Sequence, residues 1–152
     1  MSSSEIERWN AIAESWHRWI PQMHTWYEPA TELMLDLAQI KPGHRVLDIA
    51  AGDGDQTLTV AERVGPQGYI LAIDKADKLL AIAEQAAINA GYANIKTRIM
   101  DGESLELPEN SFDTVICRFA LMFFNNPVKG LQGVKRVLKP NGRFSAVVYA
   151  EN

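Results

Sequence analysis

Small residues and carboxylates share one short stretch of the chain. Residues 47–55 read LDIAAGDGD, so an apolar run gives way to Ala and Gly with acidic residues between them. Small residues let a ligand approach the backbone closely. The dinucleotide fingerprint G-x-G-x-x-G would need glycine where Thr57 stands, and the phosphate loop G-x-x-x-x-G-K-[ST] is absent. Because Asp53 and Asp55 would repel a pyrophosphate at the following helix N-terminus, the stretch suits a cationic or zwitterionic ligand.

Further charged residues follow other apolar runs directly. They are Asp74, Asp101 and Arg118. If the runs are parallel strands, their carboxyl ends meet at one edge of a sheet, where such sheets bind ligands. A polar residue at a strand end is equally well explained by its meeting water. Several of them beside a glycine turn favour a ligand site.

The order of the elements predicts how these residues are positioned. From Arg45 onward the apolar runs RVLDIA, GYILAID, NIKTRIMD, FDTVICR and RFSAVVYA alternate with helical spacing, as in residues 79–90 and 128–138. Residues 139–142 (KPNG) predict a turn. Strands that alternate with helices form right-handed βαβ units. The sequence therefore predicts an α/β fold with a mainly parallel sheet and helices on both faces.

The composition narrows the class of protein. The chain has 152 residues, the size of one domain, and its net charge of −4 argues against a nucleic-acid surface, because such surfaces are basic. A single cysteine excludes a disulfide framework. No apolar run reaches the roughly 18 residues of a membrane span, and MSSSEIERWN lacks the pattern of a signal peptide. We expect one cytoplasmic domain without a nucleic-acid partner, a membrane span or a metal site.

Several motifs, in the right order, resemble the class I S-adenosylmethionine-dependent methyltransferases. Residues 48–54 (DIAAGDG) are similar to the family motif acidic-x-Gly-x-Gly-x-Gly, with Ala50 in place of the first glycine. Asp74 stands where the family has an acidic residue for the ribose hydroxyls. MDGESLELPENSFDTV resembles the segment that joins strands 3 and 4, and RVLKPNGRFSAVVY resembles the approach to strand 5, with Asn141 where glycine is usual. The similarity is to the subgroup that includes quinone-biosynthesis and other small-molecule methyltransferases.

The resemblance implies a Rossmann-like fold with strand order 3-2-1-4-5, with S-adenosylmethionine as cofactor and S-adenosylhomocysteine as product. NAD would also use an acidic residue at position 74, but the missing fingerprint glycine and the presence of Asp101 favour S-adenosylmethionine. Arg118 could bind an acidic acceptor instead, Asp48 could cap amides of its own turn, and Lys75 could be solvated. The expected cofactor-binding residues are Asp48, Ala50, Gly52, Gly54, Asp74, Lys75, Leu79, Asp101, Gly102, Glu103 and Arg118.

The expected chemistry depends mainly on positioning. Methyl transfer displaces a neutral leaving group from a sulfonium, so holding the acceptor in line contributes much of the rate. A general base is needed only if the acceptor keeps its proton at neutral pH, and the sequence identifies none. His17 and His24 could reach over the site, but they are more typical of surface or helix-packing histidines. The Pro-Cys and Asn/Asp-Pro-Pro-Tyr motifs of nucleic-acid methyltransferases are absent, so their acceptors are not expected.

The aromatic residues suggest where the acceptor binds. All 4 tryptophans lie in the first 26 residues, and Trp9, Ile12, Trp16 and Trp19 fit one face of a helix. We expect residues 1–28 to form a helical lid over a core of residues 29–152. The alternative is a helix that only packs on the domain. The expected acceptor residues are Trp16, Trp19, Phe119 and Phe123.

The last apolar run predicts an exposed edge. Family members of this type continue past strand 5 with a helix and an antiparallel strand pair, whereas this sequence ends at Asn152. A bare apolar edge strand is usually covered. We expect either a fragment of a longer protein or a homodimer paired through strand 5. The predicted function is methyl transfer to a small apolar or aromatic acceptor, at O, N or C. The alternatives are a cofactor-binding module without catalysis and, less favoured, a nicotinamide-dependent oxidoreductase.

Overall fold

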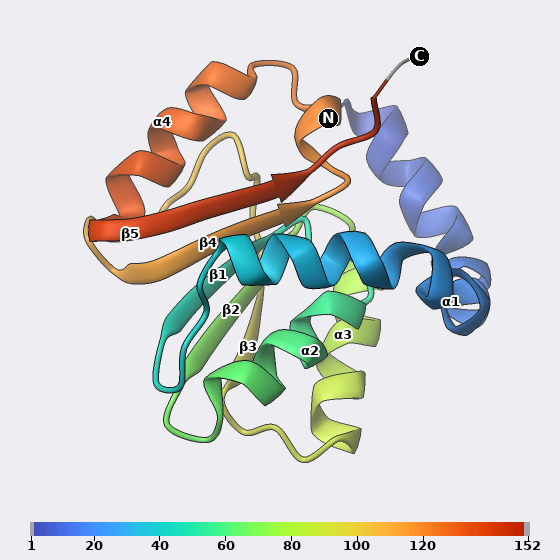
Figure 1. The fold of residues 1–152 in the computed structure, drawn as a ribbon. Coiled ribbons are helices and arrows are strands. Elements are labelled where there is room, and N and C mark those ends of the chain that lie inside the picture. Colours follow the sequence, from blue (N-terminus) through green and yellow to red (C-terminus); the bar gives the residue numbers. More distant parts are fainter. Residues whose placement is uncertain (1, 151–152) are drawn as a thin grey trace.

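A single parallel sheet forms the centre of the molecule. The computed structural model describes residues 2–150, and its 5-stranded sheet has the order β3-β2-β1-β4-β5 (Figure 1). Every neighbouring pair is parallel, which confirms the predicted α/β fold and strand order. The strands are β1 (Arg45–Ile49), β2 (Tyr69–Asp74), β3 (Ile95–Ile99), β4 (Phe112–Arg118) and β5 (Leu138–Val147).

Helices cover both faces of this sheet. They are α1 (Ser3–Leu37), α2 (Asp55–Val64), α3 (Asp77–Asn89) and α4 (Pro127–Val137), with a short 3-10 helix, η1 (Leu121–Phe123). Successive strand residues point to opposite faces. Accordingly, Val46 packs in a core with α1, α2 and α3, whereas Leu47 packs in a second core with α4. Being buried on both sides explains the nearly continuous apolar runs of the central strands.

Helix α1 is bent and runs past the expected lid boundary. A capping box of Ser2 and Glu5 begins it, and Pro21 and Pro29 lie inside it. An internal proline removes a backbone hydrogen bond and kinks a helix, which accounts for the bend in Figure 1. The first half packs on α3, where Trp9 and Trp16 contact a small apolar cluster, and the second half is anchored in the sheet core. The helix continues without a break through residue 28.

Strand β5 begins earlier than predicted. Residues 139–142 were expected to be a turn before the strand, but β5 starts at Leu138 and contains them. The pairing explains the difference, because Phe112 pairs with Leu138 while Thr114 pairs with Arg143, so residues 139–142 loop out inside the strand. Asn141 has a φ of 64°, as such an irregularity requires. β5 lies at the edge of the sheet, and dimerisation through it stays a prediction.

None of the helices within residues 2–150 is long and apolar enough to cross a membrane.

Candidate active site

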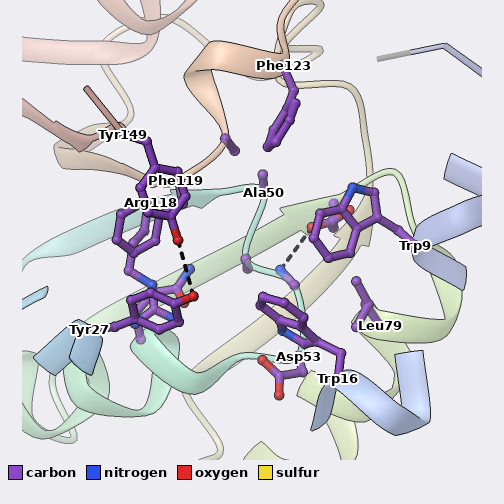
Figure 2. Close-up of a pocket in the computed structure, with 15 residues that line it drawn as sticks. Trp9, Trp16, Tyr27, Ala50, Asp53, Leu79, Arg118, Phe119, Phe123 and Tyr149 are labelled. Carbon is purple, nitrogen blue, oxygen red and sulfur yellow. Dashed lines mark hydrogen bonds between the residues drawn. The ribbon is translucent and has the colours of Figure 1, made fainter. Parts of the chain in front are cut away.

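A cavity of about 320 Å³ lies beyond the carboxyl ends of β1, β2 and β4, under the first half of α1 (Figure 2). A smaller cavity of about 20 Å³ shares Ala50 and Asp74 with it and continues along the end of β3. Carboxyl ends of adjacent parallel strands are where this fold class binds ligands. The larger cavity is lined by Trp9, Trp16, Tyr27, Ala50, Ala51, Gly52, Asp53, Gln56, Asp74, Leu79, Arg118, Phe119, Ala120, Phe123 and Tyr149.

The turn after β1 forms the floor of the cavity. Ala50, Gly52 and Gly54 have φ values of 56°, 60° and 85°. A Cβ at Gly52 would meet nothing within 4 Å, so its backbone faces open space in the cavity. A Cβ at Gly54 would lie 2.8 Å from Cβ of Ala83, so this glycine permits α2 to pack against α3. Gly54 does not line the cavity, and its role here is packing.

Asp74 ends β2 with its carboxylate in the cavity wall. Only 8% of the residue is exposed. Oδ2 accepts a hydrogen bond from the Gly52 amide at 2.9 Å, and Oδ1 accepts one from the Ala76 amide at 2.8 Å. Burial raises the pKa of Asp74, while these backbone donors oppose the shift. Each carboxylate oxygen keeps acceptor capacity for donors in the cavity.

Asp48 has a structural position beneath the floor. It is fully buried in β1, where Thr57 Oγ1 donates to it at 2.7 Å and Gln56 Nε2 donates at 3.1 Å. Burial raises its pKa to about 6, although both hydrogen bonds oppose the rise. The carboxylate therefore joins β1 to the first turn of α2 through side chains and not through amides of its own turn. Asp48 lines neither cavity.

The predicted residues that follow β2 and β3, namely Lys75, Asp101, Gly102 and Glu103, line the smaller cavity. Lys75 Nζ donates to Asp101 Oδ2 at 2.6 Å, and the Glu103 amide donates to Asp101 Oδ1 at 2.9 Å. Although burial opposes it, these bonds hold the pKa of Asp101 below its ordinary value. Lys75 is thus paired and not simply solvated. A Cβ at Gly102 would lie 2.8 Å from the Phe124 ring, which fills part of this space.

Arg118 is bound within the chain. Its side chain is 8% exposed, and Nη1 lies 2.9 Å from both Asp55 Oδ2 and Thr31 Oγ1. Asp55 Oδ1 also lies 3.1 Å from His24 Nδ1. The guanidinium therefore links the end of β4 to α2 and to the second half of α1, while still lining the cavity.

A similar contact ties the first half of α1 to the floor. His17 Nδ1 lies 2.9 Å from Oδ2 of Asp53, a residue that is buried and lines the cavity. His17 and His24 thus both face the acidic residues of the turn. This places Trp16, the neighbour of His17, over the cavity (Figure 2).

Aromatic rings form two opposite walls. On one side Tyr27, Phe119 and Tyr149 are in contact, and on the other Trp9 and Trp16 lie beside Leu79 (Figure 2). The predicted acceptor residues Trp16, Phe119 and Phe123 line the cavity. Trp19, predicted with them, is 60% exposed and is not among the lining residues. At about 100° per residue Trp16 repeats the direction of Trp9, whereas Trp19 is turned away from it.

Seven lining residues are not among the predicted site residues: Trp9, Tyr27, Ala51, Asp53, Gln56, Ala120 and Tyr149. The sequence could have indicated Asp53 and Gln56, because Asp53 lies between the two glycines of the turn and Gln56 lies two residues after it. Tyr149 lies near the end of the last apolar run, as Asp74 lies at the end of the second, so the expectation that strand ends carry the site applied to it as well.

Comparison with known proteins assigns the family. A methyltransferase domain model matches residues 40–151. The chain is 36% identical over 118 residues to the ubiquinone/menaquinone biosynthesis C-methyltransferase UbiE of Ectopseudomonas mendocina, covering 77% of this chain and 46% of that protein. The UbiE of Pasteurella multocida is 34% identical, and the match covers 77% of this chain and 44% of that protein. The chain thus spans less than half the length of these relatives.

Solved structures agree on the fold. The YcgJ protein from Bacillus subtilis superposes with a TM-score of 0.73 and 32% identity, covering 80% of this chain and 50% of that one. The [4+2]-cyclase SpnF superposes with a TM-score of 0.72 and 28% identity, covering 78% of this chain and 43% of that one. A SAM-dependent methyltransferase from Aquifex aeolicus gives a TM-score of 0.67 and 28% identity, covering 72% and 58%. The family match and the strand-end cavity lead to one conclusion: the chain belongs to the class I S-adenosylmethionine-dependent methyltransferases, whose cofactor is S-adenosylmethionine.

Proposed function

We propose that this domain binds S-adenosylmethionine at the ends of β1 and β2 and directs its methyl group to a carbon of a small aromatic, quinol-type acceptor. The observation that carries the proposal is the bond between Gly52 and the Asp74 carboxylate at the cavity floor. The printed function of the UbiE relatives, C-methylation in quinone biosynthesis, supports the choice of carbon and of a quinol.

The residues present fit the cofactor. Asp74 offers carboxylate oxygens to the ribose hydroxyls, and charge-assisted hydrogen bonds of this kind are strong. The open space at Gly52 accepts a group lying close to the backbone. Asp53 and Asp74 make this part of the cavity acidic, which suits a ligand with a sulfonium and an ammonium group. Asp101 and Gly102 would hold the adenine, provided that the Phe124 ring moves aside and enlarges the smaller cavity.

The chain's own part in the reaction is positioning. When bound, the cofactor supplies a methyl group on a sulfonium, which is a good leaving group. Trp16 and Leu79 on one side and Phe119 on the other exclude water and restrict an acceptor ring to the space between them. Correct alignment of two reactants can lower a barrier by several kcal/mol. No separate catalytic base is assigned.

One observation favours a second candidate, a binding module without catalysis. The 320 Å³ of the cavity lies near the lower end of the range for ligand pockets, which is roughly 300–1,000 Å³. Such a volume accommodates one drug-sized molecule more readily than a cofactor and an acceptor together. The likeness to a [4+2]-cyclase also illustrates that one fold supports different reactions.

Turnover separates the two candidates. Wild-type protein is incubated with S-adenosylmethionine and a panel of hydroquinones, phenols and amines, and the products are analysed by mass spectrometry. We expect a hydroquinone that gains one methyl on carbon, with one S-adenosylhomocysteine formed per product. Cofactor binding with no methylated product from any acceptor would favour the binding module.

A further inference from the structure

A phenol ring from the chain itself occupies one end of the cavity. Tyr149 follows β5, and its ring stacks on Phe119 with centroids 4.7 Å apart and planes at 15°. Its hydroxyl donates a hydrogen bond to the Tyr27 hydroxyl at 3.1 Å (Figure 2). One flat face and one hydrogen-bonding partner are what a site needs to recognise a phenol.

Phe119 is held in place at a conformational cost. Its φ is 54°, in the left-handed region that a bulky residue rarely adopts. Its amide donates to the Val147 carbonyl at 2.7 Å, which fixes this backbone to the end of β5. The Phe119 ring thereby lies between Tyr27, at a centroid distance of 5.0 Å, and Tyr149. Strained residues of this kind concentrate at functional sites.

The Tyr149 hydroxyl stays protonated at neutral pH. Burial and the hydrogen bond with Tyr27 raise its pKa to about 12, and the nearby charge of Arg118 opposes the rise. The residue is nevertheless 58% exposed, and it lies beyond the last residue of β5. A ring with this exposure can leave its partners without disrupting the sheet.

We propose that Tyr149 is an internal stand-in for the acceptor, and that a phenolic ring binds by replacing it, stacked on Phe119 and hydrogen-bonded to the Tyr27 hydroxyl. Phe119 then supplies the stacking face, and Tyr27 selects a ring that bears a hydroxyl. The inference rests on the proposed function only in placing the acceptor in the same cavity as the cofactor. Displacement of Tyr149 would also enlarge the space beside the cofactor, so that a cavity of about 320 Å³ could hold both a cofactor and an acceptor.

The test measures binding of p-cresol and of toluene, its analogue without the hydroxyl, by ligand-observed NMR titration of the full chain. In Tyr149→Ala the subsite is free, so the Kd for p-cresol should fall roughly tenfold, since apparent affinity scales with the fraction of open protein. Val148→Ala is the matched control, because Val148 is the exposed neighbour and does not line the cavity. Equal affinities of these two variants for p-cresol would overturn the inference.

Further variants test the roles of the partners. Tyr149→Phe keeps the stacking ring and loses only the hydroxyl bond, so p-cresol should bind a few-fold more tightly than to wild type, and unchanged binding would count against the stand-in role. Adding Tyr27→Phe to Tyr149→Ala should remove the preference for p-cresol over toluene, and a retained preference would exclude Tyr27 as the selecting residue. Circular dichroism confirms folding. Calorimetry with S-adenosylhomocysteine on the same samples tests the proposed function separately, because the cresol titration needs no cofactor.

Discussion

The amide of Gly52 and the carboxylate of Asp74 are joined by a hydrogen bond of 2.9 Å, which ties the turn after β1 to the end of β2. These residues are 22 positions apart in the chain, and the strands β1 and β2 that lead to them are adjacent and parallel. The bond orients one carboxylate oxygen along the cavity floor and fixes the left-handed turn beside it. A single contact thus shapes the two surfaces that the proposed nucleoside touches.

The two glycines of the turn should respond differently to substitution. Gly54→Ala brings a methyl group within 2.8 Å of Ala83 at a φ of 85°, so we expect a loss of about 2–4 kcal/mol in the free energy of unfolding. Gly52→Ala has free space and should lose only about 1–2 kcal/mol from its left-handed backbone. The added methyl group points into the cavity. Although Gly52→Ala should remain folded, it should therefore bind S-adenosylhomocysteine more weakly than wild type. Urea unfolding and calorimetry measure both quantities, and the reverse order of stabilities would refute the assignment.

Asp48 should make stability depend on pH in an unusual direction. Its pKa in the folded protein, about 6, lies above the ordinary value of 3.8, so the folded state retains a proton that the unfolded state releases. The stability from this proton is fully present below about pH 3.8 and is lost as the pH rises through 6. Asp48→Asn lacks this titration. Its free energy of unfolding relative to wild type should therefore rise between pH 4 and pH 7, by about 3 kcal/mol at most. A difference that stays constant over this range would show that Asp48 titrates normally.

Arg118 should act as a structural link as well as a cavity residue. Arg118→Leu leaves the Asp55 carboxylate, which is 13% exposed, without its guanidinium partner. Breaking a buried pair by removing one partner costs about 3–5 kcal/mol, and we expect a loss near the lower end because His24 remains bonded to Asp55. The double variant Arg118→Leu/Asp55→Leu should recover part of that loss in chemical denaturation. If the losses simply add, the two residues are not coupled.

Deletion of residues 1–27 tests the lid. The deletion removes Trp9, Trp16 and Tyr27, but it keeps Met34 and Leu35, which anchor the second half of α1 in the sheet core. The remaining chain should fold, as judged by circular dichroism, and should lose methyl transfer because one cavity wall is gone. Trp26→Ala serves as a control, because this side chain is 79% exposed and is not a lining residue. Turnover by the shortened chain would refute the lid.

Parallel pairing and the position of the site could be predicted from local patterns, whereas the strand order was implied by the resemblance to the methyltransferase family. The alternation of apolar runs with helical spacing indicates parallel pairing, and Asp74 and Arg118 end their strands in the cavity wall as expected. Side-chain directions on α1 could not be predicted in the same way. In a straight helix Trp19 lies on the same apolar face as Trp9 and Trp16. In the folded protein Trp9 and Trp16 contact α3 and the cavity, whereas Trp19 is exposed to solvent.

Contacts between distant segments were also beyond sequence patterns. The stack of Tyr149 on Phe119 depends on β5 lying beside β4, and its bond to Tyr27 depends on where α1 crosses the end of the sheet. No spacing rule relates positions that are 122 residues apart. The looped residues 139–142 carry a correct turn signal, but only the register with β4 determines that the strand continues on both sides of the turn.

The most direct measurement is calorimetric titration of S-adenosylhomocysteine into wild type, Asp74→Ala and Asp113→Ala. Asp113 is the matched control, because its carboxylate bonds to the Arg45 amide and to Lys139 at the opposite end of the sheet. We predict binding to wild type and to Asp113→Ala with similar affinity, and binding to Asp74→Ala weaker by about 2 kcal/mol or more, roughly 30-fold in Kd. Equal affinity of the two variants, or no binding to wild type, would contradict a nucleoside held by Asp74.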